Sequence, residues 1–279
     1  MSFWYSLLNW LPFDWVTLNF MKNALLAVCI LAPLFGILST SIVTGRMSFF
    51  SDALGHSAFT GIAIGVLCGM AFPMFAAVLL SVAFALLFTY VRAKTQQSAD
   101  TVIGVFSSTA VALGIFIATL GGSSFTKFNQ YLIGDILSVA PGEIGLLALV
   151  LLGVLVLWLF CSNRILLTAI HPQLASSRGI STRASEMLFT TVIAVVVTLS
   201  MSWVGLLVIN SLLVLPAAAS RNIAKNMQQY LLFSVLGALL CSLLGLFTSY
   251  EIGCSTGATI SLYLALYFAV TFCFRKMRQ

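Results

Sequence analysis

The residues with the clearest chemical potential are an aspartate and a histidine four positions apart, Asp52 and His56, in an otherwise apolar stretch. On a helix, residues at this spacing share one face. A carboxylate oxygen and an imidazole nitrogen both suit a divalent transition metal such as zinc or manganese. Two ligands hold a metal weakly, as a transit site requires. Two structural alternatives stay open: a pair that satisfies itself within the bundle, or an aspartate that caps its helix.

Other polar or small residues in apolar stretches give weaker signals. Asn210 and Ser211 could line a pathway or form hydrogen bonds between helices, and packing is the favoured interpretation. Asp135 lies between two apolar stretches and could attract a cation, although a solvated acid is the commoner case. Gly61 and Gly65 form a G-x-x-x-G pattern, which predicts that two helices approach closely there.

Two motifs that would indicate an enzyme do not occur in the sequence. There is no phosphate-binding loop of the G-x-x-x-x-G-K-[ST] type, so any ATP that drives this protein must bind another subunit. There is also no H-E-x-x-H, which argues against an intramembrane metalloprotease. The six cysteines have no C-x-x-C spacing and are interpreted as small buried hydrophobic residues. We therefore expect a protein without catalytic residues and without a resident cofactor.

The composition requires a membrane. Hydrophobic residues make up 61% of the chain and charged residues 7%, whereas a soluble domain carries about 25% charged residues. The apolar runs are continuous and long enough to cross a bilayer, which predicts an all-α polytopic bundle. Segment 1–22 is expected to be interfacial, and 23–279 to form a single transmembrane domain. Nine spans are expected, or eight if the two around 203–205 form one broken helix: 23–44, 51–71, 73–91, 101–120, 145–161, 187–203, 205–220, 230–249 and 255–274.

The basic residues predict the orientation. With nine spans, Lys22 and Lys127 fall on one side of the membrane and the other eleven Lys and Arg residues on the opposite side. Cytoplasmic loops carry such an excess, so the C-terminus is expected inside and the N-terminus outside the plasma (inner) membrane. The net charge of +6 is spread over separate loops, which fits anionic lipid and does not indicate nucleic-acid binding. The eleven are Arg46, Arg92, Lys94, Arg164, Arg178, Arg183, Arg221, Lys225, Arg275, Lys276 and Arg278.

The longest loop expected on the cytoplasmic side covers 162–186. It contains a short helical stretch from Pro172 to Arg178, and the glycine that follows, Gly179, is typical of a helix stop. Such a loop suits the docking of a partner protein, and the alternative is a plain connector.

Four ordered stretches resemble the signature of the zinc/manganese/iron-type ABC importer permeases, and the resemblance extends over nearly the whole chain from about residue 23. The first is Arg46-Met-Ser-Phe-Phe-Ser-Asp-Ala-Leu-Gly-His-Ser57, followed by Gly61 to Gly65. The others are the outside-loop motif at 131–139, the cytoplasmic coupling loop at 174–180 and the late-span motif at 204–219.

This resemblance implies the helical fold shared with vitamin B12 and siderophore importers. It also implies a homodimer, two ATP-binding subunits on the cytoplasmic face and an extracytoplasmic metal-binding protein that delivers the cargo. Leu174, Ala175, Arg178 and Gly179 correspond to the coupling loop. The implied function is inward transport of zinc, manganese or iron, and the alternative is a siderophore or B12-type importer. A secondary carrier acting alone would need no docking loop. The sequence leaves the identity of the metal open.

Overall fold

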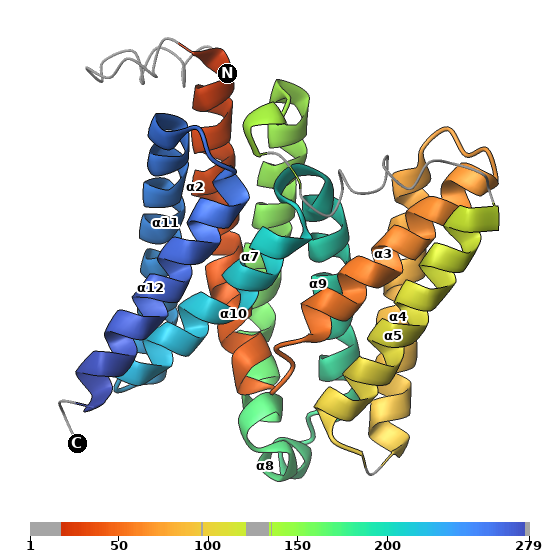
Figure 1. The fold of residues 1–279 in the computed structure, drawn as a ribbon. Coiled ribbons are helices and arrows are strands. Elements are labelled where there is room, and N and C mark those ends of the chain that lie inside the picture. Colours follow the sequence, from red (N-terminus) through yellow and green to blue (C-terminus); the bar gives the residue numbers. More distant parts are fainter. Residues whose placement is uncertain (1–17, 96, 121–133, 135, 277–279) are drawn as a thin grey trace.

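The computed structural model describes residues 18–95, 97–120, 134 and 136–276. Nine helices in these ranges are long and apolar enough to cross a membrane, which confirms the all-α polytopic prediction. They alternate in direction along the chain, with a short helix α8 at the lower end of the bundle in Figure 1. The long helices are α2 (Asn19–Thr44), α3 (Phe50–Leu67), α4 (Pro73–Lys94), α5 (Ala99–Leu120), α7 (Pro141–Ile170), α9 (Thr182–Val204), α10 (Leu206–Ile223), α11 (Met227–Ile252) and α12 (Thr256–Lys276).

The sequence left open whether α9 and α10 form one broken helix or two. They are separate helices joined at Gly205, whose φ of 82° and ψ of 155° lie in a backbone region that only glycine enters readily. The chain reverses direction at this residue, so α10 starts inside the bundle beside α3 (Figure 1).

Two expected boundaries differ from the structure. The range 162–186, expected as a loop, is mostly helical, because α7 continues to Ile170, α8 covers Pro172–Ser177 and α9 begins at Thr182. The polar residues after 161 indicate where the chain leaves the membrane. The helix does not end there, because its backbone hydrogen bonds also form in water. At the other end, α2 begins at Asn19 and takes in part of the segment expected to be interfacial, whose residues 1–17 lie outside the described ranges.

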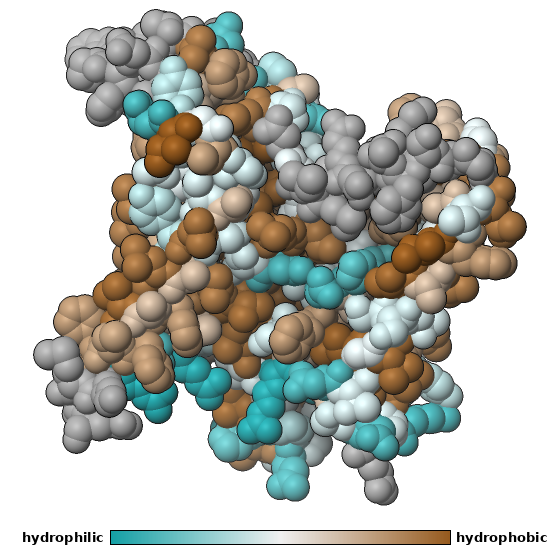
Figure 2. All heavy atoms as spheres, in the orientation of Figure 1, coloured by the Kyte–Doolittle hydropathy of each residue, from teal (hydrophilic) through white to brown (hydrophobic). Residues whose placement is uncertain are grey.

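The surface is apolar around the flanks and polar at the ends. Leu159 and Phe160 of α7 are each 80% exposed, which is typical of side chains that face lipid. Hydrophilic side chains gather at the lower end, over α8 and the adjacent helix ends (Figure 2). Arg92 and Lys94 lie in the last turn of α4, and Arg221 lies in the last turn of α10. The described basic residues therefore concentrate where these downward helices end.

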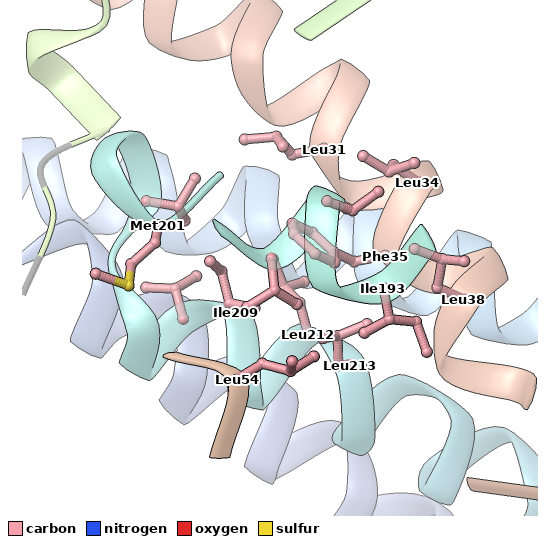
Figure 3. Packing of buried hydrophobic residues seen from close by; sticks show 14 of the residues in the cluster. Leu31, Leu34, Phe35, Leu38, Leu54, Ile193, Met201, Ile209, Leu212 and Leu213 are labelled. Atoms are coloured by element: carbon pink, nitrogen blue, oxygen red, sulfur yellow. The ribbon is translucent and has the colours of Figure 1, made fainter. Parts of the chain in front are cut away.

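The central helices are α2 and α3, which are the most buried of the spans. Side chains of α2, α3, α9 and α10 meet in one apolar core, part of which is drawn in Figure 3. The predicted close approach at the G-x-x-x-G pattern is confirmed. A Cβ on Gly61 would lie 2.5 Å from Ala77 Cα, and one on Gly65 would lie 2.9 Å from Pro73 Cα, so α3 and α4 are in backbone contact.

Candidate functional site

Asp52 lies in the first turn of α3 but does not cap the helix. The cap residue is Phe49, and Asp52 is the third residue of the helix. The capping alternative left open by the sequence is therefore wrong. The positive end of the helix dipole still favours a carboxylate at this position.

Asp52 and His56 lie on one face of α3, as their spacing predicts. His56 Nε2 is 3.5 Å from Asp52 Oδ2, and the side chains are 27% and 41% exposed, respectively. A separation of 3.5 Å is long for a hydrogen bond, so the carboxylate and the imidazole do not fully satisfy one another. Both side chains remain accessible to a ligand.

A third polar side chain reaches this pair from a distant part of the sequence. Asn210 Nδ2, in the second turn of α10, donates a hydrogen bond of 3.0 Å to Asp52 Oδ1. The amide oxygen of Asn210 is buried and has no hydrogen-bond partner within the described part of the protein. A buried polar atom without a partner is costly, so Asn210 Oδ1 is a free acceptor beside the carboxylate. The neighbouring Ser211 instead donates to Leu207 O of its own helix, at 3.0 Å.

The close approach of α3 and α10 brings these residues together. A Cβ on Gly55 would lie 2.1 Å from Cδ1 of Leu206, the first residue of α10, so a larger residue would separate the helices. On the same stretch of α3, Leu54 is fully buried and points toward Leu213 and its neighbours on α10 (Figure 3). Apolar packing on both sides of Gly55 thus fixes Asn210 against Asp52. The sequence carries no local signal for this contact, because 158 positions separate the two residues.

Asp52 and Asn210 open onto a pocket of about 440 Å³ between α3, α10 and α12. Figure 1 shows that α3 begins well above the lower ends of α4, α5 and α7, so the first turn of α3 lies inside the bundle. In Figure 2 a small patch of hydrophilic residues lies over adjoining parts of α3 and α10, with hydrophobic residues beside and below it. The remaining pocket-lining residues are apolar or small: Leu206, Leu207, Ser255, Gly257 and Ala258.

The site carries negative charge that the described residues do not neutralise. The ion pairs among them are Asp52–His56 and Arg92–Glu186, so Asp52 has no Lys or Arg partner there. No third histidine, cysteine or acid joins the pair within the same part of the chain. Within one copy of the described structure, the side chains here that could bind a metal are therefore Asp52 and His56.

The residues expected at the coupling loop lie on and after α8. Leu174 is 46% exposed and Arg178 is also exposed, whereas Ala175 is buried against the bundle. Gly179 has a φ of 72°, which confirms the predicted glycine stop, and Ile180 N donates to Ala175 O at 3.0 Å. Leu174 on α8 and Arg178 directly after it are therefore both accessible at this end of the bundle. Asp135 lies outside the described residues, between Gly134 and the short 3-10 helix Ile136–Ser138.

Comparisons with known proteins match this architecture. A family model described as the ABC 3 transport family covers residues 17–275. The chain is 31% identical over 257 residues to the manganese import system permease protein ScaB of Streptococcus parasanguinis, covering 91% of this chain and 90% of the relative. It is 27% identical over 248 residues to the high-affinity zinc uptake system membrane protein ZnuB of Haemophilus influenzae, covering 89% and 95%. The solved structure of PsaBC from Streptococcus pneumoniae in complex with Fab aligns with a TM-score of 0.78 at 25% identity, over 97% of this chain and 95% of that one.

Proposed function

Because the chain belongs to the ABC 3 transport family, we propose that it is the membrane-spanning permease subunit of an importer that moves a divalent transition metal into the cytoplasm. Zinc, manganese and iron(II) are the candidate cargoes. The observation that carries the proposal is the cluster of Asp52, His56 and Asn210, of which Asp52 and Asn210 line a pocket between α3, α10 and α12. Relatives named as manganese and zinc uptake proteins support this class of cargo.

The chemistry of the site suits passage better than storage. Asp52 offers a hard, charged oxygen and His56 a borderline nitrogen, a combination that manganese, iron(II) and zinc all accept. A set this small binds the ion weakly enough to release it. A metal enclosed in a chelate would hide its coordination sites from Asp52 and His56, so the chelate importer does not explain this arrangement.

A second copy of the chain would cover the exposed face of the site. Asp52 is 41% exposed beside Leu207, which is 55% exposed, and hydrocarbon does not tolerate a charged carboxylate there. A homodimer that buries this face would enclose the pocket between its subunits.

The basic end of the bundle indicates how the chain is oriented in the membrane and where an ATP-binding subunit would dock. Because cytoplasmic loops carry the excess of Lys and Arg, we infer that α8 and the C-terminus lie inside and the N-terminus outside the plasma membrane. In this orientation α8, with Leu174 and Arg178 exposed, is the docking element for a separate ATP-binding subunit. The opposite end of the bundle receives metal from an extracytoplasmic solute-binding protein. The chain itself acts as a transport subunit and not as an enzyme.

Uptake by a reconstituted complex tests this function. The chain, its ATP-binding subunit and its solute-binding protein are placed in liposomes, and entry of zinc, manganese and iron(II) is measured with ATP supplied to the ATPase side. We expect uptake that needs ATP and all three components, with competition among the cargo metals. The purified chain alone should hydrolyse no ATP. Metal entry without the ATP-binding subunit, or hydrolysis by the isolated chain, would refute the proposal.

A further inference from the structure

Away from the candidate metal site, Arg92 connects three segments of the chain near the lower end of the bundle. Its Nη1 atom donates to Glu186 Oε1 of α9 at 2.7 Å, and its Nη2 atom makes a longer and weaker contact of 3.5 Å with Gly45 O in the turn between α2 and α3. The side chains of Arg92 and Glu186 are 27% and 30% exposed. Among the described residues this is the one ion pair between an arginine and a carboxylate.

The segment held at Gly45 leads directly to the candidate metal site. The turn is tight, because Gly45 N donates to Ser41 O at 2.8 Å and Met47 N to Ile42 O at 3.0 Å. Arg46 has a φ of 54°, a left-handed conformation that is unfavourable for a residue other than glycine. Arg92 contacts the carbonyl of the peptide that leads into this strained residue. The position of the turn fixes where α3 begins, and Asp52 lies in its first turn.

The segment held at Glu186 leads to the docking element. Glu186 lies in the second turn of α9, which begins at Thr182, a few residues after α8 and Gly179. One helical turn further along the interface between α4 and α9, Thr89 Oγ1 and Thr190 Oγ1 form a buried hydrogen bond of 3.0 Å. Two polar contacts one turn apart therefore fix α9 to α4.

A cavity separates α8 from the turn before α3. It measures about 350 Å³ and is lined by Pro172 of α8, Thr182 of α9, Ile165 of α7, Met47 of the turn and Arg92. Arg92 and Glu186 both line this cavity, and their ion pair with a charge-assisted hydrogen bond is the stronger kind of polar contact.

We propose that Arg92 is a positioning residue that transmits movement from the docked ATPase to the metal site, through Glu186 on α9 and the Gly45 carbonyl before α3. The inference rests on the proposed function as an ATP-driven permease. It assigns Arg92 no contact with metal or with nucleotide. Loss of the connection is expected to leave both partners bound and to separate ATP hydrolysis from metal movement.

The test measures metal ions transported per ATP hydrolysed in the reconstituted complex, together with the melting temperature of each variant. Arg92→Gln and Glu186→Gln should keep ATP hydrolysis and lower this ratio about tenfold, the effect of losing a charge-assisted hydrogen bond. Lys94→Gln is the matched control. Lys94 lies two residues further along α4, where its Nζ is 4.7 Å from the centre of the Tyr90 ring. This control should keep the wild-type ratio.

A charge exchange separates coupling from stability. The double variant Arg92→Glu with Glu186→Arg restores an ion pair between α4 and α9, but position 92 no longer has a donor for Gly45 O. We expect its melting temperature to recover and its transport ratio to stay low. A wild-type ratio in the double variant or in both single variants would overturn the inference. Should Arg92→Gln fail to assemble, Arg92→Lys replaces it in the test. Lysine keeps the charge but lacks the forked donors, so we expect the same low ratio, and a wild-type ratio would overturn the inference. A wild-type complex that hydrolyses ATP without moving metal would instead refute the proposed function.

Discussion

Replacing Asp52 with asparagine removes the charge from the candidate metal site and hardly changes the size of the side chain. Asn210 Nδ2, which donates to Asp52 Oδ1 at 3.0 Å, keeps a partner because asparagine also carries a carbonyl oxygen. The interaction lost within the chain is the pair with His56 at 3.5 Å. Partly exposed ion pairs contribute about 0–1 kcal/mol, so the variant is expected to fold and assemble.

The loss to metal binding is much larger. A carboxylate oxygen about 2.1 Å from a divalent ion contributes about 4 kcal/mol even with the screening of bulk water. This corresponds to about a thousandfold in affinity, and the drier interior of the bundle increases the effect. Metal transport and protein stability therefore respond to the same change by very different amounts.

The assay compares initial uptake rates of zinc and manganese in the reconstituted complex with the melting temperature and the yield of assembled complex. Asp100→Asn is the matched control, because Asp100 is also an acid in the first turn of a helix and is exposed at the start of α5. We expect Asp52→Asn to lose uptake at normal assembly and Asp100→Asn to transport normally. Uptake at the wild-type rate in Asp52→Asn, or a decrease that only follows a lower yield of complex, would refute the reasoning.

Three further outcomes are expected. Gly55→Val places side-chain atoms where Leu206 packs, so it should cost about 1–3 kcal/mol and lower the melting temperature; an unchanged value would contradict the close contact between α3 and α10. Gly179→Val forces a β-branched residue to a φ of 72°, at about 1–2 kcal/mol, and should reduce the amount of ATP-binding subunit that copurifies about tenfold; undiminished recovery would argue against docking at α8. Leu207→Cys should form a disulfide-linked dimer under oxidation whereas Leu159→Cys on α7 should not, and crosslinking of both or of neither would count against a dimer that covers the pocket.

The sequence predicts the spans well because each one depends on a single local property. A continuous apolar run must be helical in hydrocarbon, and the predicted span 101–120 differs from α5 (Ala99–Leu120) by two residues at one end. The same reasoning fails at the end of α7. The polar side chains there predict that the chain has left the membrane: Ser162, Asn163 and Arg164. The helix nevertheless continues through them, because its backbone hydrogen bonds do not depend on the membrane.

The candidate site is only half predictable from sequence. The spacing of Asp52 and His56 predicts that both side chains lie on the same face of one helix, because four residues make about one turn. The contact from Asn210 depends instead on how α10 packs against α3, which the space left by Gly55 and the reversal at Gly205 determine together. The sequence around these two glycines does not indicate which helix packs against them. The pathway role predicted for Ser211 and Asp135 stays a prediction.

X-ray absorption at the metal edge tests the central claim most directly, because it reports the ligands of the cargo itself. The wild-type complex is loaded with manganese or zinc, trapped with its ATPase subunit arrested, and compared with the His56→Ala variant. We expect a first shell of oxygen and nitrogen at about 2.0–2.2 Å, with imidazole scattering that disappears in the variant. A shell of water oxygens alone, or identical imidazole scattering in both proteins, would contradict it.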